Sequence, residues 1–268
     1  MSKTLDHLLA AIALLVLPAA VSPASSGEPD AAVAPYASEV PGYAVRDGAA
    51  GTFLDEAEAN LPVAQTVDYI VGQYLQQRGG YGGVKRIVTL DYTGTRYVGR
   101  DHYPLHVHAA RPNTSDTLVG SSQSSMFESS RSGEDIHIRG VPVGLGVEDE
   151  RALLKTFDFD GAVVDWKDKH YAIKRLGMEK LPGVLTWKLE VDRPDGLRQI
   201  LYLDSRYGDV VKELVMNTGS VPIVEIVRHD FRAVEGSRYP FAVDYKKPNG
   251  AVLASDRVER IEVKRQPN

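Results

Sequence analysis

The sequence of 268 residues contains no cysteine. This absence excludes disulfide bonds, thiolate nucleophiles, cysteine-based zinc sites and a lipid anchor on an N-terminal cysteine. Basic residues are not in excess either, because 36 Asp and Glu outnumber 31 Lys and Arg and give a net charge of −5. A protein that binds the nucleic-acid backbone normally carries the opposite charge or a dense basic patch. We therefore expect no nucleic-acid partner.

Motifs for catalysis and cofactor binding are also missing. The sequence has no Walker loop, no G-x-G-x-x-G after a predicted strand, no G-x-S-x-G and no H-E-x-x-H. A Ser-rich run at residues 121–132 could hold a nucleophile, but no residue pattern marks a base for it. We therefore predict no catalytic residue and no cofactor, and we expect that the protein is not an enzyme.

The densest group of possible metal ligands consists of His102, His106 and His108. On a strand, His106 and His108 would point to the same face about 7 Å apart. A neighbouring strand could add His137 and complete a metal site. No carboxylate stands at ligand spacing, and an exposed polar face of a β-ribbon explains the pattern better. We predict that these residues bind no metal.

The N-terminal segment has the features of a targeting signal. Residues 8–20 are apolar, follow Lys3 and precede several small residues. The run is shorter than the ~20 residues that a membrane-spanning helix needs. We predict a cleavable signal peptide at residues 1–24 and no membrane span after its removal, with an uncleaved anchor as the alternative. Residues 25–60, rich in Ala, Gly, Pro and acids, are predicted to be a flexible leader before a folded domain at residues 61–268.

Hydrophobic spacing in the folded domain changes from helical to extended after a glycine pair. From Asn60 to about residue 78, apolar residues recur on one helical face, and Gly79 and Gly80 would end the helix. Alternation of apolar and polar residues then predicts strands, including weaker ones at residues 118–130 and 134–142. A second short helix is expected near residues 147–157.

Two turn signals define hairpins in the second half of the chain. Pro194-Asp195-Gly196 and Pro248-Asn249-Gly250 each separate two alternating segments. The predicted fold class is α+β, mainly antiparallel β, with a curved half-barrel sheet of about ten to eleven strands covered by two or three helices. The predicted inner face of this sheet comprises Val88, Leu90, Tyr92, Leu185, Trp187, Leu189 and Val191.

The central part of the domain resembles a known family. Residues 157–216 are similar to the periplasmic outer-membrane lipoprotein-sorting proteins, the LolA-like and LolB-like family. The resemblance rests on Asp160-Gly161 at a predicted strand start and on L-G-x-E-x-L-P-G at residues 176–183 before a W-K-L-x-V strand. A hairpin at Gly196 followed by Tyr-Leu-Asp at residues 202–204 completes the pattern.

Further similarity extends this resemblance over residues 62–265, through Arg111-Pro112 and residues 231–240. It implies an open half-barrel in the periplasm, with a helical lid over an apolar cavity. In the family, an arginine near the start of the sheet holds the lid shut, and Arg86 and Arg96 are both candidates for that role.

The resemblance also implies a class of ligand, although the residues leave two interpretations open. In the first, the seven inner-face residues form the wall of a hollow cavity that binds a lipid or an acylated, lipoprotein-type ligand. In the second, the half-barrel is filled. The protein is then a non-enzymatic structural or signalling module of the envelope that binds a protein partner.

Overall fold

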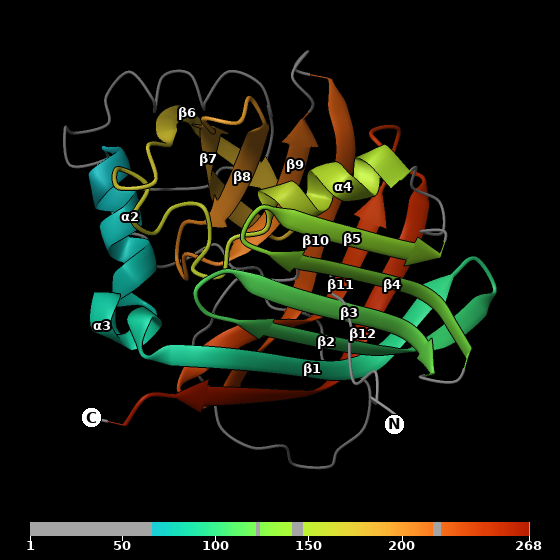
Figure 1. The fold of residues 1–268 in the computed structure, drawn as a ribbon. Helices are drawn as coiled ribbons and strands as arrows, with labels where there is room; N and C mark the ends of the chain where they lie inside the picture. The colour runs from blue at the N-terminus through green and yellow to red at the C-terminus, as the bar shows by residue number, and fades with distance from the viewer. Residues whose placement is uncertain (1–65, 122–123, 141–146, 217–220, 268) are drawn as a thin grey trace, which may run out of the picture.

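The computed structural model describes residues 66–121, 124–140, 147–216 and 221–267. Within these ranges the chain forms three helices and twelve strands (Figure 1). The helices are α2 (Val67–Gln76), α3 (Gly80–Lys85) and α4 (Val147–Thr156). A first set of strands precedes α4, and consists of β1 (Ile87–Val98), β2 (Asp101–Ala110), β3 (Thr114–Ser121), β4 (Ser124–Ser132) and β5 (Asp135–Gly140).

A second set of strands follows α4 and completes a single sheet. It consists of β6 (Ala172–Leu181), β7 (Val184–Asp192), β8 (Arg198–Asp204), β9 (Val210–Met216), β10 (Pro222–Val234), β11 (Ser237–Lys246) and β12 (Val252–Arg265). The strands lie in the order β5-β4-β3-β2-β1-β12-β11-β10-β9-β8-β7-β6. Neighbours in each set are antiparallel, and the antiparallel pairing of β1 with β12 joins the two sets. The sheet is curved and does not close (Figure 1).

The predicted fold class is therefore confirmed, with one difference in the number of strands. The described residues form twelve strands instead of ten or eleven. The reason is that residues 118–130, predicted as a single weak strand, contribute to both β3 and β4. Serine has little preference for strands, so the alternation of inward and outward side chains is hard to recognise there.

Both predicted hairpin turns are present. Between β7 and β8, the Asp195 carboxylate accepts a hydrogen bond of 3.2 Å from the backbone N–H of Leu197. Between β11 and β12, the backbone N–H of Lys247 donates to the carbonyl of Ala251 at 2.8 Å. Gly196 and Gly250 have positive φ angles of 81° and 85°, which a residue with a side chain adopts only with strain.

The helix predicted before Gly79 and Gly80 is present, but the structure that follows these glycines differs from the prediction. The hydroxyl of Thr66 caps α2, and the predicted start at Asn60 lies outside the described residues. α2 ends at Gln76, shortly before the glycine pair, and Gly79, with a φ of 77°, is the N-cap of α3. The extended structure predicted directly after the glycine pair is wrong, because residues 80–85 form α3 and the strand begins at Ile87. A Cβ on Gly83 would lie 2.6 Å from the carbonyl oxygen of Arg78, so this turn of helix depends on glycine.

The contact between β1 and β12 leads to a prediction about Gly94. A Cβ on Gly94 would lie 2.9 Å from the Cα of Val258 and would also collide with the carbonyl oxygen of Arg257. Gly94→Ala should therefore lower the free energy of unfolding by about 1–3 kcal/mol, as measured by urea denaturation.

Gly72→Ala is a control that is expected to change stability in the opposite direction. Gly72 lies inside α2, and a Cβ there would meet nothing within 4 Å. Gly72→Ala should raise stability by about 0.5–1 kcal/mol through the higher helix propensity of alanine. Equal stabilities of the two variants would contradict the packing of β1 against β12 described above.

Candidate functional site

The concave face of the sheet is covered by one stretch of chain between the two edge strands. Residues 147–171 run from the side of β5 to the start of β6 and include α4, which lies across the sheet in Figure 1. We call residues 157–164 the plug, because the side chains of this irregular segment fill the space beside α4. Its fully buried apolar side chains are Phe157, Phe159, Val163 and Val164.

Two arginines from opposite parts of the sheet hold the C-terminal end of α4. Arg131 on β4 is buried, and its Nη1 donates to the carbonyls of Leu154, Lys155 and Phe157 at 2.7–2.9 Å. Arg193, after β7, donates to the carbonyl of Lys155 at 2.6 Å. The last carbonyls of a helix have no partner inside the helix and carry a partial negative charge, so both guanidiniums stabilise this end of α4.

Ion pairs hold the plug in place. The Asp160 carboxylate accepts hydrogen bonds from Arg111 at 2.5 and 2.9 Å and from Lys85 at 2.5 Å. Burial by itself would raise the pKa of Asp160, but the hydrogen bonds from these two cations outweigh it and lower this pKa below 3.8. Asp158 pairs with Lys169 at 2.7 Å. Asp160 was predicted at a strand start; it lies instead in the plug, and β6 begins at Ala172.

The structure places most of the predicted inner-face residues in the core. Leu90, Tyr92, Trp187, Leu189 and Val191 are buried in the same hydrophobic cluster as α2, α4 and the plug. The other two predicted residues are only half-buried. The pairing of β1 with β12 shifts register between Ile87 and Thr89, and Ile87 is buried in place of Val88. Leu185 lies near the beginning of β7.

A small pocket lies between the plug and strands β8, β9 and β10. Its volume is about 40 Å³. One water needs about 10–15 Å³ by this measure, and an apolar cavity of about 150 Å³ is needed for a ligand such as benzene. The pocket therefore has room for a few waters or one small chemical group, and in this conformation the plug occupies the space that an acyl chain would need. None of the seven predicted wall residues lines it.

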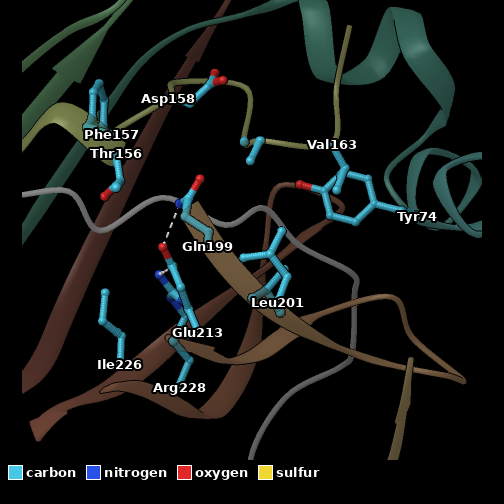
Figure 2. A pocket seen from close by; sticks show the side chains of 13 residues that line it. Tyr74, Thr156, Phe157, Asp158, Val163, Gln199, Leu201, Glu213, Ile226 and Arg228 are labelled. Carbon is cyan, nitrogen blue, oxygen red and sulfur yellow. Dashed lines mark hydrogen bonds and ion pairs between the residues drawn. The ribbon is translucent and has the colours of Figure 1, made fainter. Parts of the chain in front are cut away.

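The floor of this pocket is polar, as Figure 2 shows. Gln199 on β8, Glu213 on β9 and Arg228 on β10 point into it and are nearly inaccessible to solvent. The amide of Gln199 and the guanidinium of Arg228 both donate to the Glu213 carboxylate at 2.7 Å. We call these three residues the polar floor. Leu201 and Ile226 contribute apolar walls beside it.

A second buried polar group lies on the concave face under α4. Arg96 on β1 donates two hydrogen bonds of 2.6 Å to Asp256 on β12. Glu150 on α4 is fully buried, and neither of its carboxylate oxygens has a hydrogen-bond partner in the described part of the chain. Of the two candidate lid arginines, Arg86 is exposed and Arg96 is buried. Arg96 lies close enough to Glu150 of α4 for its positive charge to act on that carboxyl group.

Burial raises the pKa of Glu150 from 4.5 to about 8, and the charge of Asp256 adds to this effect, whereas the positive charge of Arg96 opposes it. Glu150 is therefore mainly protonated at neutral pH and contributes a neutral carboxyl group to the concave face.

Sequence reasoning named Arg96 only as one of two candidate lid arginines, and it missed Glu150, Asp256 and the polar floor, although a signal was present. Arg96 follows Tyr92 with the side-chain parity of an inner-face residue, and Arg228 follows Ile226 in the same way. A charged residue at an inward position interrupts the apolar alternation, and such an interruption can mark a buried polar group.

The histidines do not form the cluster that the spacing suggested. β5, which carries His137, is separated from β2 by two other strands, so His137 does not lie beside His106 and His108. One carboxylate from a neighbouring strand does lie beside these histidines, because His108 pairs with Asp91 on β1 at 2.7 Å. Within the described residues, no three His, Asp or Glu side chains are grouped as ligands for a metal ion.

The arrangement defines a class of protein: an open antiparallel half-barrel whose concave face is covered by helices and a connecting segment. Among solved structures, it is similar to a LolA superfamily protein from Nitrosomonas europaea, with a TM-score of 0.52 and 11% identity over 75% of this chain and 95% of that chain. It is also similar to a domain assigned to outer membrane lipoprotein sorting from Vibrio parahaemolyticus, with a TM-score of 0.50 and 10% identity over 75% and 93% of the two chains.

The chain therefore has the LolA-like fold that the sequence resemblance predicted. No protein-family model matches the sequence, and no curated protein matches it. Identities near 10% show the fold alone. In the described ranges, none of the helices has the length and apolar character needed to cross a membrane. The predicted signal peptide and leader lie outside those ranges.

The raised pKa of Glu150 leads to a prediction about pH. Between the unfolded pKa of 4.5 and the folded pKa of about 8, the folded protein binds the Glu150 proton more strongly than the unfolded chain does. Stability should consequently fall as pH rises through this window. Glu150→Gln removes this effect. Between pH 5.5 and pH 8.5, the free energy of unfolding of the wild type should therefore fall by about 3 kcal/mol relative to that of the variant.

Urea denaturation at the two pH values measures this difference. Glu148→Gln is the matched control, because Glu148 lies on the solvent-exposed side of the same helix. It should leave the pH dependence unchanged. A wild-type pH profile identical to that of Glu150→Gln would show that Glu150 is ionised or accessible to solvent in the folded protein.

Proposed function

We propose that the protein is a non-enzymatic carrier or binding protein of the bacterial periplasm, reached through the predicted signal peptide. Its ligand would be a lipid or an acylated, lipoprotein-type molecule that lies on the apolar concave face of the half-barrel. The LolA-like fold supports this proposal, since one of the similar solved structures is assigned to outer membrane lipoprotein sorting.

The observation that carries the proposal is the way in which the concave face is covered. Apolar side chains from strands of both sets face the lumen, including Leu90, Leu189 and Phe241. A short helix and an irregular plug cover them, instead of a second sheet. Displacing this cover breaks no pairing between strands, so the apolar surface can be exposed while the sheet stays intact.

Ligand binding in this proposal requires the plug to move. The pocket of about 40 Å³ is too small for an acyl chain. The plug is held by ion pairs of Asp160 and Asp158 and by side chains that pack on the concave face. An acyl chain would occupy the positions of those side chains, and the five buried residues among the predicted wall residues would contact it.

A second candidate function follows from the same pocket volume. If the plug does not move, the lumen stays filled, and the protein is a structural or signalling module of the envelope that binds a protein partner. The two functions differ in whether weakening the contacts of the plug creates a binding site for lipid.

Asp160→Asn tests this difference. Loss of the carboxylate charge weakens the contacts with Arg111 and Lys85 and should lower stability by about 2–3 kcal/mol. It should also raise the affinity for a fluorophore-labelled fatty acid by about tenfold, since about 1.4 kcal/mol less would be needed to displace the plug. Fluorescence titration measures the affinity.

Asp68→Asn is the control, because Asp68 forms an exposed ion pair with Lys167 outside the plug, and such pairs contribute little. Its affinity should equal that of the wild type. Lys85→Met provides a milder change at the same contact should Asp160→Asn fail to fold. If the wild type and the folded plug variants all bind no labelled fatty acid, the carrier function is wrong and the protein-partner function replaces it.

A further inference from the structure

The polar floor has the properties of a built binding site. Its three side chains come from three neighbouring strands, and each is more than nine-tenths buried, with exposed fractions of 3% for Gln199, 6% for Glu213 and 4% for Arg228. Hydrogen bonds of 2.7 Å fix both Gln199 and Arg228 to the central carboxylate. In Figure 2, Tyr74 reaches toward the same pocket from α2 on the opposite side.

Several polar atoms of the floor lack a partner among the described residues. These are Oε1 of Gln199 and both Nε and Nη1 of Arg228. The great majority of buried polar side-chain atoms in folded proteins are hydrogen-bonded, so each exception requires an explanation. Gln199 carries an unpartnered acceptor and Arg228 carries unpartnered donors, and both residues line the same pocket. This combination points to a small group that both accepts and donates hydrogen bonds.

The charge of the floor limits the kind of group that fits. Glu213 already neutralises Arg228, so the floor has no net charge to attract a free inorganic anion. Instead it offers N–H donors from Arg228 and one amide acceptor from Gln199. A carboxyl, ester or hydroxyl group provides the matching acceptor oxygen, and a hydroxyl also provides a proton for the amide oxygen. The volume of about 40 Å³ suits such a group.

We propose that the polar floor binds the oxygen-bearing group of an amphipathic ligand, whose hydrocarbon part lies on the apolar concave face. The ligand oxygen accepts hydrogen bonds from Nε and Nη1 of Arg228, and a ligand hydroxyl donates to Oε1 of Gln199. The lumen therefore selects oxygenated chains over bare hydrocarbons. This inference rests on the proposed function and adds the chemical class of the ligand.

A purely structural role explains the floor less well. Replacing a buried ion pair by apolar residues of similar size is often neutral or stabilising, so a core that only has to be stable gains little from Glu213 and Arg228. Lys212 and Glu225 form another ion pair between β9 and β10, at 2.7 Å, and these side chains are about one-fifth exposed. The two ion pairs join the same strands but differ in burial and in their surroundings.

The test compares four probes of equal chain length: decanoic acid, methyl decanoate, 1-decanol and decane. Each displaces a fluorophore-labelled fatty acid from the wild type, from Glu213→Leu/Arg228→Met and from Lys212→Met/Glu225→Leu. The first double variant removes both charges of the floor without leaving an unpaired buried charge, and the second is the matched control. The acid and ester arms distinguish a free fatty acid from an esterified acyl chain.

We call Glu213→Leu/Arg228→Met the floor variant. Its affinity for the oxygenated probes relative to decane should be lower than that of the wild type by about tenfold or more, which is the equivalent of one or two hydrogen bonds. Decane should bind the floor variant as well as the wild type, or more tightly. The control variant should keep the wild-type preference. If the floor variant does not fold, Gln199→Met should reduce the preference for 1-decanol over methyl decanoate.

Two outcomes overturn the inference while leaving the proposed function intact. In one, the wild type binds all four probes in the order of their hydrophobicity alone. In the other, the floor variant keeps the wild-type preference, which would mean that only water or the protein itself satisfies the floor. Absence of binding by every probe to every variant instead contradicts the proposed function.

Discussion

The pairing of β1 with β12 is the constraint on which the rest of the structure depends. Because the first and last strands meet inside the sheet, its edges are β5 and β6, which follow one another in the sequence. The connection between them has to cross from one edge to the other, and its path lies over the concave face (Figure 1). Two features fix this pairing: Gly94 permits close approach of the Arg257 backbone, and Arg96 is bonded to its cross-strand neighbour Asp256.

Much of the sheet could be predicted because it depends on local signals. Turns with glycine at a positive φ, such as Gly196 and Gly250, determine where a hairpin reverses, and alternation determines which side chains face inward. Trp187 and Leu189 are buried for this reason. Prediction failed where local preference was weak or where the decisive contact was distant in sequence. The glycine-rich helix α3 has low intrinsic helix propensity, and it forms where Gly83 lies against the backbone of Arg78.

The candidate site was less predictable than the fold, because its polar residues acquire their meaning only from partners on other strands. Arg228 has an inward position, yet nothing in the adjacent sequence indicates that Glu213 and Gln199 will face it. The same holds for the plug. Asp160 is one of several aspartates in its segment, and only the tertiary structure brings Arg111 and Lys85 to it. Long-range electrostatic partners of this kind leave no period in the sequence.

Exchange of the plug for a ligand would involve two large and nearly equal free energies. Burial of an aromatic or aliphatic side chain contributes about 1.5–3 kcal/mol, so Phe157, Phe159, Val163 and Val164 together contribute about 6–12 kcal/mol. An acyl chain gains about 0.8 kcal/mol for each methylene, so a chain of about 8 to 15 methylenes would replace them without a large net change. Such a balance suits reversible binding, because small terms then decide which state prevails. In the proposed exchange, those terms would be the ion pairs of Asp160, which favour the plug, and the unpartnered atoms of the polar floor, which would favour an oxygenated ligand.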